Sequence, residues 1–250
     1  MAVSETGVSI PEFPNIVTIL AKKFEGTPFS QSLYLWESLI FSLLVAGILT
    51  GIAFYASRNA KPIPGRLQSA VELLVGGMDD FICGILGPTG RRFTPFIGTL
   101  FIYILFMNLI GLIPFLKSPT ADWSTTAALA ICVFVYVQYT AFKELGILGY
   151  IDHLMGKPRG VMAFSVVLPL FMFAMHLMTE LIKPLTLSLR LRSNVWGDDM
   201  LLATLANFGI PGIPLLFFSV LLVLIATTVQ ALVFSTLSTI YFALFLAHEE

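Results

Sequence analysis

Apolar residues along this chain gather in runs longer than the helices of a soluble protein need. Runs of about 18 apolar residues or more predict helices that cross a membrane. The pattern predicts an all-α polytopic membrane protein with about five transmembrane helices. Three spans of ordinary length are expected at 33–56, 93–116 and 124–142, and two much longer segments at 161–197 and 199–247.

The stretch at 61–87 has a different pattern. Its apolar residues follow helical spacing, and charged or amide residues such as Arg66, Gln68 and Glu72 lie between them. This predicts an amphipathic helix in the membrane interface, parallel to the bilayer plane. Residues 1–32 are predicted to be an extramembrane tail. They lack a basic segment followed by an apolar one, so we expect no cleaved signal peptide.

The two long segments are too long to stand upright in a bilayer. A continuous helix over the 36 residues 161–196 would measure about 54 Å. The hydrocarbon core is only about 30 Å thick. We therefore expect a steeply tilted antiparallel hairpin.

Composition agrees with a membrane protein. The chain is 57% hydrophobic and 12% charged, with a mean hydropathy of +0.89. A soluble domain is roughly 25% charged, so this chain lacks the polar surface to cover a globule in water. Its net charge of −1 gives no information about a nucleic-acid or acidic partner, and we expect no nucleic-acid partner. Cys83 and Cys132 form no CxxC motif and are expected to be free.

Basic residues outside the spans predict the orientation. Eight of them lie on one side of the predicted topology and three on the other. The positive-inside rule places the richer side in the cytoplasm. Five spans then put the N-terminus outside and the C-terminus inside. The richer side carries Arg58, Lys61, Arg66, Arg91, Arg92, Lys143, Lys157 and Arg159, and the other carries Lys22, Lys23 and Lys117.

Polar and charged residues interrupt the two long segments. An arginine at mid-bilayer costs at least roughly 2.5–3.5 kcal/mol, and such residues usually mark an ion path. The alternative is that some of them reach the interface, as an ion pair of Glu180 with Lys183 would. The candidates are His176, Glu180, Lys183, Arg190, Arg192, Asn194, Asp198, Asp199 and Gln230.

Helical spacing sorts these candidates. Thr186, Arg190 and Asn194 follow one another at four-residue intervals and share a helix face. Asp199 lies half a turn out of phase with Arg190 and about 13.5 Å further along a continuous helix. The arginine and this carboxylate therefore cannot pair directly, as two separate aqueous routes would require.

Arg192 lies off that face. It is expected to stack on Trp196, four residues later, or to hold an acid such as Asp198.

His176 and Glu180 are also four residues apart and are predicted to handle protons. A metal site would need a third ligand at a recognisable spacing, and HExxH is absent, so no metal is expected. The chain also lacks a P-loop, a GxSxG motif and a dinucleotide-binding turn. We expect no cofactor and no nucleotide hydrolysis by this chain itself.

Five motifs give the chain a resemblance to subunit a of the F-type ATP synthase, the membrane stator beside the rotating c-ring. LSLRLRSN matches the family's signature and puts its essential arginine at Arg190 and its asparagine at Asn194. TVQALVF puts the family's glutamine at Gln230. The supporting matches are PGRLQSAVE, FMNLIGLIP and SPTADWS, the last of which contains Asp122.

The chain departs from the family pattern at four places. Within LSLRLRSN, the sequence Arg192-Ser193 follows LRL where the family commonly has Phe-Gly or Tyr-Gly, so a second positive charge is present. Asp199 stands where many members have Glu. Val223 replaces a histidine of some bacterial members, and His176 stands where some have Glu.

The resemblance implies a proton-translocating stator with two aqueous half-channels against the c-ring. It also implies b-type peripheral stalk subunits and the rest of the synthase as partners, contact with membrane lipids, and a bacterial plasma (inner) membrane. The alternatives are a self-contained secondary transporter, although no inverted repeat is evident, and a membrane hydrolase using His176 and Glu180.

Overall fold

The computed structural model describes residues 28–58, 65–113, 116–155, 164–209 and 212–246, and every regular element in these ranges is helical. The all-α class is therefore confirmed. The helices are α2 (Pro28–Arg58), α3 (Arg66–Leu86), α4 (Thr94–Ile110), α5 (Trp123–Met155), α6 (Phe164–Ala206) and α7 (Ile213–Leu246), with short 3₁₀ turns η1 (Pro88–Arg92) and η2 (Pro119–Ala121). Most of the predicted tail lies outside the described residues.

Within the described ranges, four helices are long and apolar enough to cross a membrane: Trp36–Arg58, Trp123–Gly146, Leu170–Ala206 and Ile213–Phe245. Such helices define a polytopic membrane protein.

The predicted span at 93–116 is shorter than expected, because α4 has only 17 residues. Gly111 ends the helix, and the chain returns so closely that a Cβ at Gly111 would lie 2.8 Å from the Cβ of Ser118.

Two other predicted boundaries change. The amphipathic helix expected at 61–87 is α3, which buries Met78 and Ile82. The interfacial loop expected at 143–160 is helical as far as Met155, because α5 continues past a kink at Gly146. That glycine has φ 68°, a left-handed conformation that glycine adopts without steric cost.

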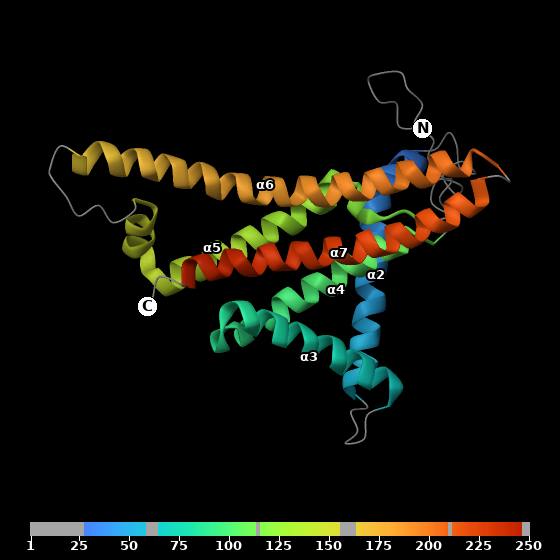
Figure 1. Cartoon of the computed structure of the whole chain (residues 1–250), viewed down its shortest axis with the longest axis horizontal. Coiled ribbons are helices and arrows are strands. Elements are labelled where there is room, and N and C mark those ends of the chain that lie inside the picture. The colour runs from blue at the N-terminus through green and yellow to red at the C-terminus, as the bar shows by residue number, and fades with distance from the viewer. Residues whose placement is uncertain (1–27, 59–64, 114–115, 156–163, 210–211, 247–250) are drawn as a thin grey trace.

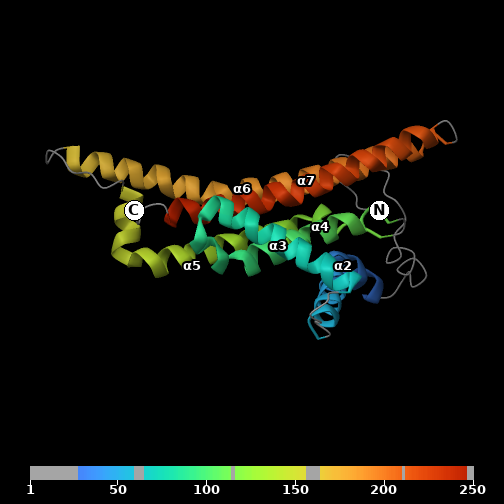
Figure 2. The ribbon, with the colours of Figure 1, turned by 60° about the horizontal axis from the view of Figure 1, so that its bottom comes forward.

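The two long helices form the expected antiparallel hairpin. α6 and α7 run side by side and cross α2 at a steep angle (Figure 1). Seen from another direction, they bend together as one curved layer (Figure 2). Our predicted boundary near residue 198 was wrong, because α6 is one helix of 43 residues that continues through Asp198 and Asp199.

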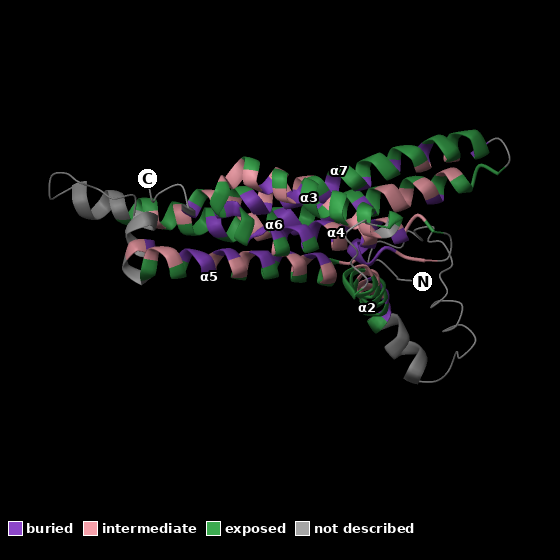
Figure 3. Ribbon diagram, turned by 90° about the horizontal axis from the view of Figure 1, so that it is seen from below, coloured by how far each residue is buried: buried purple, intermediate pink, exposed green. Residues whose placement is uncertain are grey.

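The helix α7 buries small side chains where it packs into the rest of the chain. Ala231, Ser235, Ser238 and Thr239 of α7 are all fully buried. Small residues allow helix backbones to approach closely where no hydrophobic effect drives association. α6 by contrast is largely exposed within this chain (Figure 3). Only 6% of the residues in its most apolar stretch are buried, against 33% for the corresponding stretch of α5.

Candidate functional site

The candidate site is centred on the middle of α6. Its inward ridge consists of Leu187, Leu191 and Val195, which are 2%, 0% and 7% exposed. These residues repeat every four positions, so together they bury one face of the helix. The residues that directly precede them lie about 100° further around the axis. Thr186, Arg190 and Asn194 are all exposed on the surface of this chain.

The surroundings of Arg190 are apolar. Large exposed hydrophobic side chains precede it on α6, among them Leu185 and Leu189. In a bilayer such a surface faces hydrocarbon or another protein, and an arginine facing hydrocarbon is costly. A partner that supplies a compensating group would remove this cost.

Two of the predicted site residues join α6 to α7. The amide nitrogen Nδ2 of Asn194 donates a 2.6 Å hydrogen bond to Oε1 of Gln230. Gln230 is only 5% exposed, and its Nε2 has no hydrogen-bond partner among the described residues. The spacing argument did not foresee this pairing, because it considered one helix at a time.

Arg192 has partners other than those we expected. Its guanidinium carbon lies 5.7 Å from the centre of the Trp123 ring, and its Nε donates a 3.3 Å hydrogen bond to the carbonyl of Ala121. The predicted stack on Trp196 or bond to Asp198 is therefore replaced by contacts with η2 and the start of α5. Helical spacing alone cannot reveal a partner on another helix.

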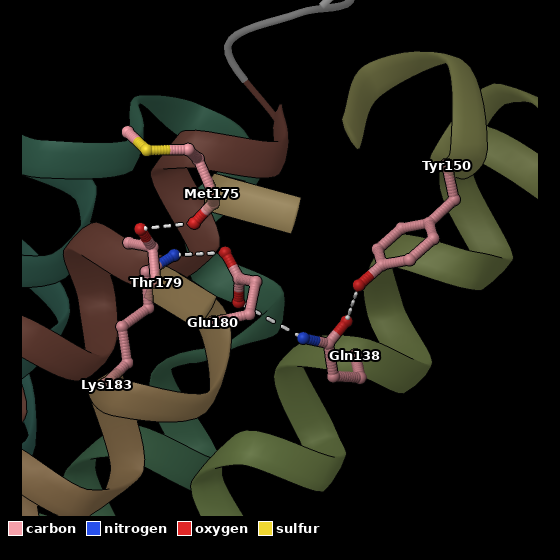
Figure 4. Close-up of polar contacts among 6 residues, drawn as sticks. All are labelled: Gln138, Tyr150, Met175, Thr179, Glu180 and Lys183. Carbon is pink, nitrogen blue, oxygen red and sulfur yellow. Dashed lines mark hydrogen bonds and ion pairs between the residues drawn. The ribbon is translucent and has the colours of Figure 1, made fainter. Parts of the chain in front are cut away.

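A polar cluster on the first half of α6 links that helix to α5. Gln138 lies between Tyr150 and Glu180 (Figure 4). Its Nε2 donates to Glu180 at 3.1 Å, and its Oε1 accepts from the Tyr150 hydroxyl at 2.7 Å. Burial, together with the charge of Glu180, raises the pKa of Tyr150, so its hydroxyl remains a donor. Lys183 forms an ion pair with Glu180.

The predicted pairing of His176 with Glu180 is not made. Nδ1 of His176 contacts the carbonyl of Met172 at 3.0 Å, whereas Glu180 is held by Lys183 and Gln138. The ion pair considered as the alternative does form. It is buried, with side-chain exposures of 15% for Lys183 and 12% for Glu180.

The ammonium of Lys183 also lies 5.2 Å from the centre of the Tyr241 ring. Together with apolar neighbours, Glu180, Lys183 and Tyr241 line a pocket between α5, α6 and α7.

A second pocket lies on the far side of Arg190. Asp198 and Asp199 line it from α6, Asn108 from α4 and Thr227 from α7. Because α6 is unbroken, the residues in these pockets lie at defined positions along one helix. Glu180 is about 15 Å before Arg190 and Asp199 is about 13.5 Å after it.

The sequence analysis missed Gln138, Tyr150 and Asn108. Each amide stands alone within an apolar run, which was the available signal. Asp122 of the SPTADWS motif follows η2 directly, and its main-chain carbonyl accepts a 3.2 Å hydrogen bond from the Thr126 hydroxyl.

The fold and the site define a polytopic membrane protein with polar and charged residues in a long helical hairpin. Comparison with known proteins identifies its family. A model of the family "ATP synthase A chain" matches residues 39–243. The chain belongs to this family.

Its relatives include "ATP synthase subunit a" of Protochlamydia amoebophila, which is 40% identical over 94% of this chain and 89% of that protein. The same name is carried by relatives from Desulfotalea psychrophila, 36% identical over 95% and 91%, and from Oleidesulfovibrio alaskensis, 35% identical over 82% and 84%.

The Glu180–Lys183 pair leads to a stability prediction. Lys183→Met strands a buried carboxylate and is expected to destabilise the protein by about 3–5 kcal/mol. The double variant Glu180→Gln with Lys183→Met should recover most of that loss, measured by thermal unfolding of the purified complex. The exposed pair of Arg91 with Asp79 is the control, and Arg91→Met should change stability by less than about 1 kcal/mol. A double variant as unstable as the single one would contradict the pairing.

The contacts of Arg192 lead to a second prediction. Arg192→Phe keeps an aromatic partner for Trp123 and should retain most ATP-driven proton pumping, measured in inverted membrane vesicles. Complete loss of pumping with normal assembly would show instead that the second arginine takes part in charge transfer.

Proposed function

We propose that this chain is the proton-translocating stator subunit a of an F-type ATP synthase, working against a ring of c subunits. The observation that carries the proposal is Arg190, an exposed cation on an apolar face of α6. Family membership and the two flanking pockets, each of which contains ionisable side chains, support it.

The proposed mechanism follows from the cost of charge in hydrocarbon. A carboxyl group on the rotating ring stays neutral while it faces lipid, because a bare carboxylate there is expensive. Beside Arg190 the same group can ionise. The guanidinium keeps its proton, so it attracts the carboxylate without relaying a proton itself. Arg190 thereby separates proton entry from proton exit.

The two pockets are proposed to be the inner ends of the half-channels. The one at Glu180 and Lys183 connects to the cytoplasm, and the one at Asp198 and Asp199 connects to the outside. This assignment follows from the distribution of basic residues, with the N-terminus outside and the C-terminus inside the bacterial plasma membrane. The membrane potential then supplies about 2.3 kcal/mol per charge for each 100 mV.

Further roles follow for the remaining candidates. Asn194 and Gln230 are proposed to fix the face that meets the ring, since their hydrogen bond joins α6 to α7 at that level. Thr186 continues the face one turn before Arg190. His176 is proposed to exchange protons at the cytoplasmic mouth, one turn before Glu180. Peripheral stalk subunits of the b type are proposed to hold the chain still against the ring.

The exposure of Arg190 favours a stator over a self-contained transporter. A transporter that moves ions by itself surrounds its site with its own helices near the midplane. Here the cation is directed away from the packed core of the chain.

The central prediction is that Arg190→Ala abolishes ATP-driven proton pumping. The reason is that the ring carboxylate then has no fixed cation beside which to ionise. Pumping is measured in inverted membrane vesicles, and assembly by co-purification with the ring. Assembly should survive because the side chain is exposed. Arg66→Ala, at another exposed arginine, is the control and should pump normally. Substantial pumping by Arg190→Ala would refute the mechanism.

The outer carboxylate provides a second functional prediction. Asp199→Asn is expected to slow ATP synthesis and pumping severely, whereas Asp199→Glu should keep much of both. Asp198→Asn should be milder, because Asp199 alone matches the family spacing. Near-normal rates in Asp199→Asn together with loss in Asp198→Asn would assign the role to the other carboxylate.

A further inference from the structure

A buried chain of hydrogen-bonded hydroxyl groups adjoins the pocket lined by Asp198 and Asp199, which we call the outer pocket. The side-chain oxygens of Thr120 and Ser118 are 2.7 Å apart, and the Ser118 hydroxyl donates to the carbonyl of Met107 at 3.0 Å. Thr120 also lies within hydrogen-bond distance of the Asn108 amide. Thr120 is 0% exposed, Ser118 2% and Asn108 4%. These residues belong to the NLIGLIP and SPTAD segments, which the proposed mechanism does not otherwise use.

The protons of this chain of hydroxyl groups can be counted. With the carbonyl oxygen of Asn108 directed at Thr120, three oxygen–oxygen contacts share only two hydroxyl protons. In one of the three contacts, two oxygen atoms would then face each other with no proton between them. The amino group of Asn108 would also be left buried without a partner among the described residues. Buried donors without partners are rare in proteins.

Turning the amide by 180° gives each of these three contacts its own proton. The two ends of an asparagine amide have nearly the same shape, so the hydrogen-bond network decides between them. The Asn108 amino group then donates to Thr120, Thr120 donates to Ser118, and Ser118 donates to Met107. The Met107 carbonyl needs this donor, because the main-chain N–H of Gly111 bonds the carbonyl of Asn108 instead.

We infer that Asn108 presents its carbonyl oxygen to the pocket lined by Asp198 and Asp199, and that it thereby favours a protonated carboxyl there. Resting on the proposed outer half-channel, this makes Asn108 a positioning residue for proton entry. An oxygen acceptor can receive a hydrogen bond from a neutral acid or a water molecule. It repels an ionised carboxylate.

In the sequence, charged residues adjoin the pocket-lining segments at two places. The segment between α4 and α5 carries Lys117 and Asp122, and α6 carries Arg190 and Arg192. The helices α4 and α7, which pack against the pocket, contribute no Asp, Glu, Lys, Arg or His over their described lengths. Asn108 is therefore the main side chain through which α4 can affect the protonation of the carboxyl groups in the pocket.

The test measures ATP synthesis by the complete synthase in liposomes. The membrane potential and the pH on the catalytic side are held constant. The pH on the opposite side, from which protons enter, is varied, and the pH of half-maximal rate is recorded.

Two variants remove the oriented acceptor in different ways. Asn108→Ala leaves room for water, and Thr120→Val frees the amide to turn its amino group outward. Both should lower the midpoint by roughly half to one pH unit, the effect of losing one hydrogen bond to the neutral acid. Thr228→Val is the matched control, because among the described residues that hydroxyl bonds the carbonyl of Leu224 on its own helix. Its midpoint should not move.

The sign of the shift decides the inference. If the amino group of Asn108 faced the pocket, it would stabilise the carboxylate, and Asn108→Ala would raise the midpoint. An unchanged or raised midpoint in the variants that assemble overturns the inference. Normal synthesis in both Asp198→Asn and Asp199→Asn would instead refute the proposed outer half-channel.

Discussion

The high free energy of an unpaired charge in hydrocarbon is the constraint on which the rest of this structure depends. α6 meets it in two ways within a single helix. Near its beginning, Glu180 is neutralised inside the chain by Lys183 and held by Gln138. Further along, Arg190 is exposed on the surface of this chain. In the proposed mechanism the internal pair stabilises the fold, whereas the exposed cation attracts a complementary carboxylate of the ring.

The packing of the hairpin serves this division. The ridge of Leu187, Leu191 and Val195 fixes the rotation of α6 about its axis, because turning the helix would expose these buried side chains. The hydrogen bond from Asn194 to Gln230 fixes the same rotation from the polar side. Gln230 is buried, so another rotation of α6 would leave its Oε1 without this donor.

Much of this fold follows from the sequence because hydropathy and helical periodicity are local properties. The long apolar runs predicted the hairpin, and four-residue spacing predicted the face that Arg190 shares with Asn194. Contacts between helices were harder to foresee. Arg192 was assigned to Trp196 on its own helix, but its guanidinium lies over the Trp123 ring because α5 packs against α6.

Helix ends were also misplaced, for reasons that involve neighbouring segments. α4 ends at Ile110 because only glycine fits at position 111 beside Ser118. α6 passes through two aspartates because a pocket that also contains Asn108 and Thr227 receives them. Asn108 and Gln138 each carried the signal of a lone amide in an apolar run, but their partners depend on the tertiary fold.

The unbroken course of α6 has a mechanical consequence. One continuous helix carries Glu180, Arg190 and Asp199, so the separations between these groups are fixed by the hydrogen-bonded backbone. Stretching or twisting a helix between them would break several main-chain hydrogen bonds at once. The distances between these three side-chain positions along α6 therefore stay constant. In the proposed mechanism, the part that moves during each step is therefore the ring of c subunits and not this helix.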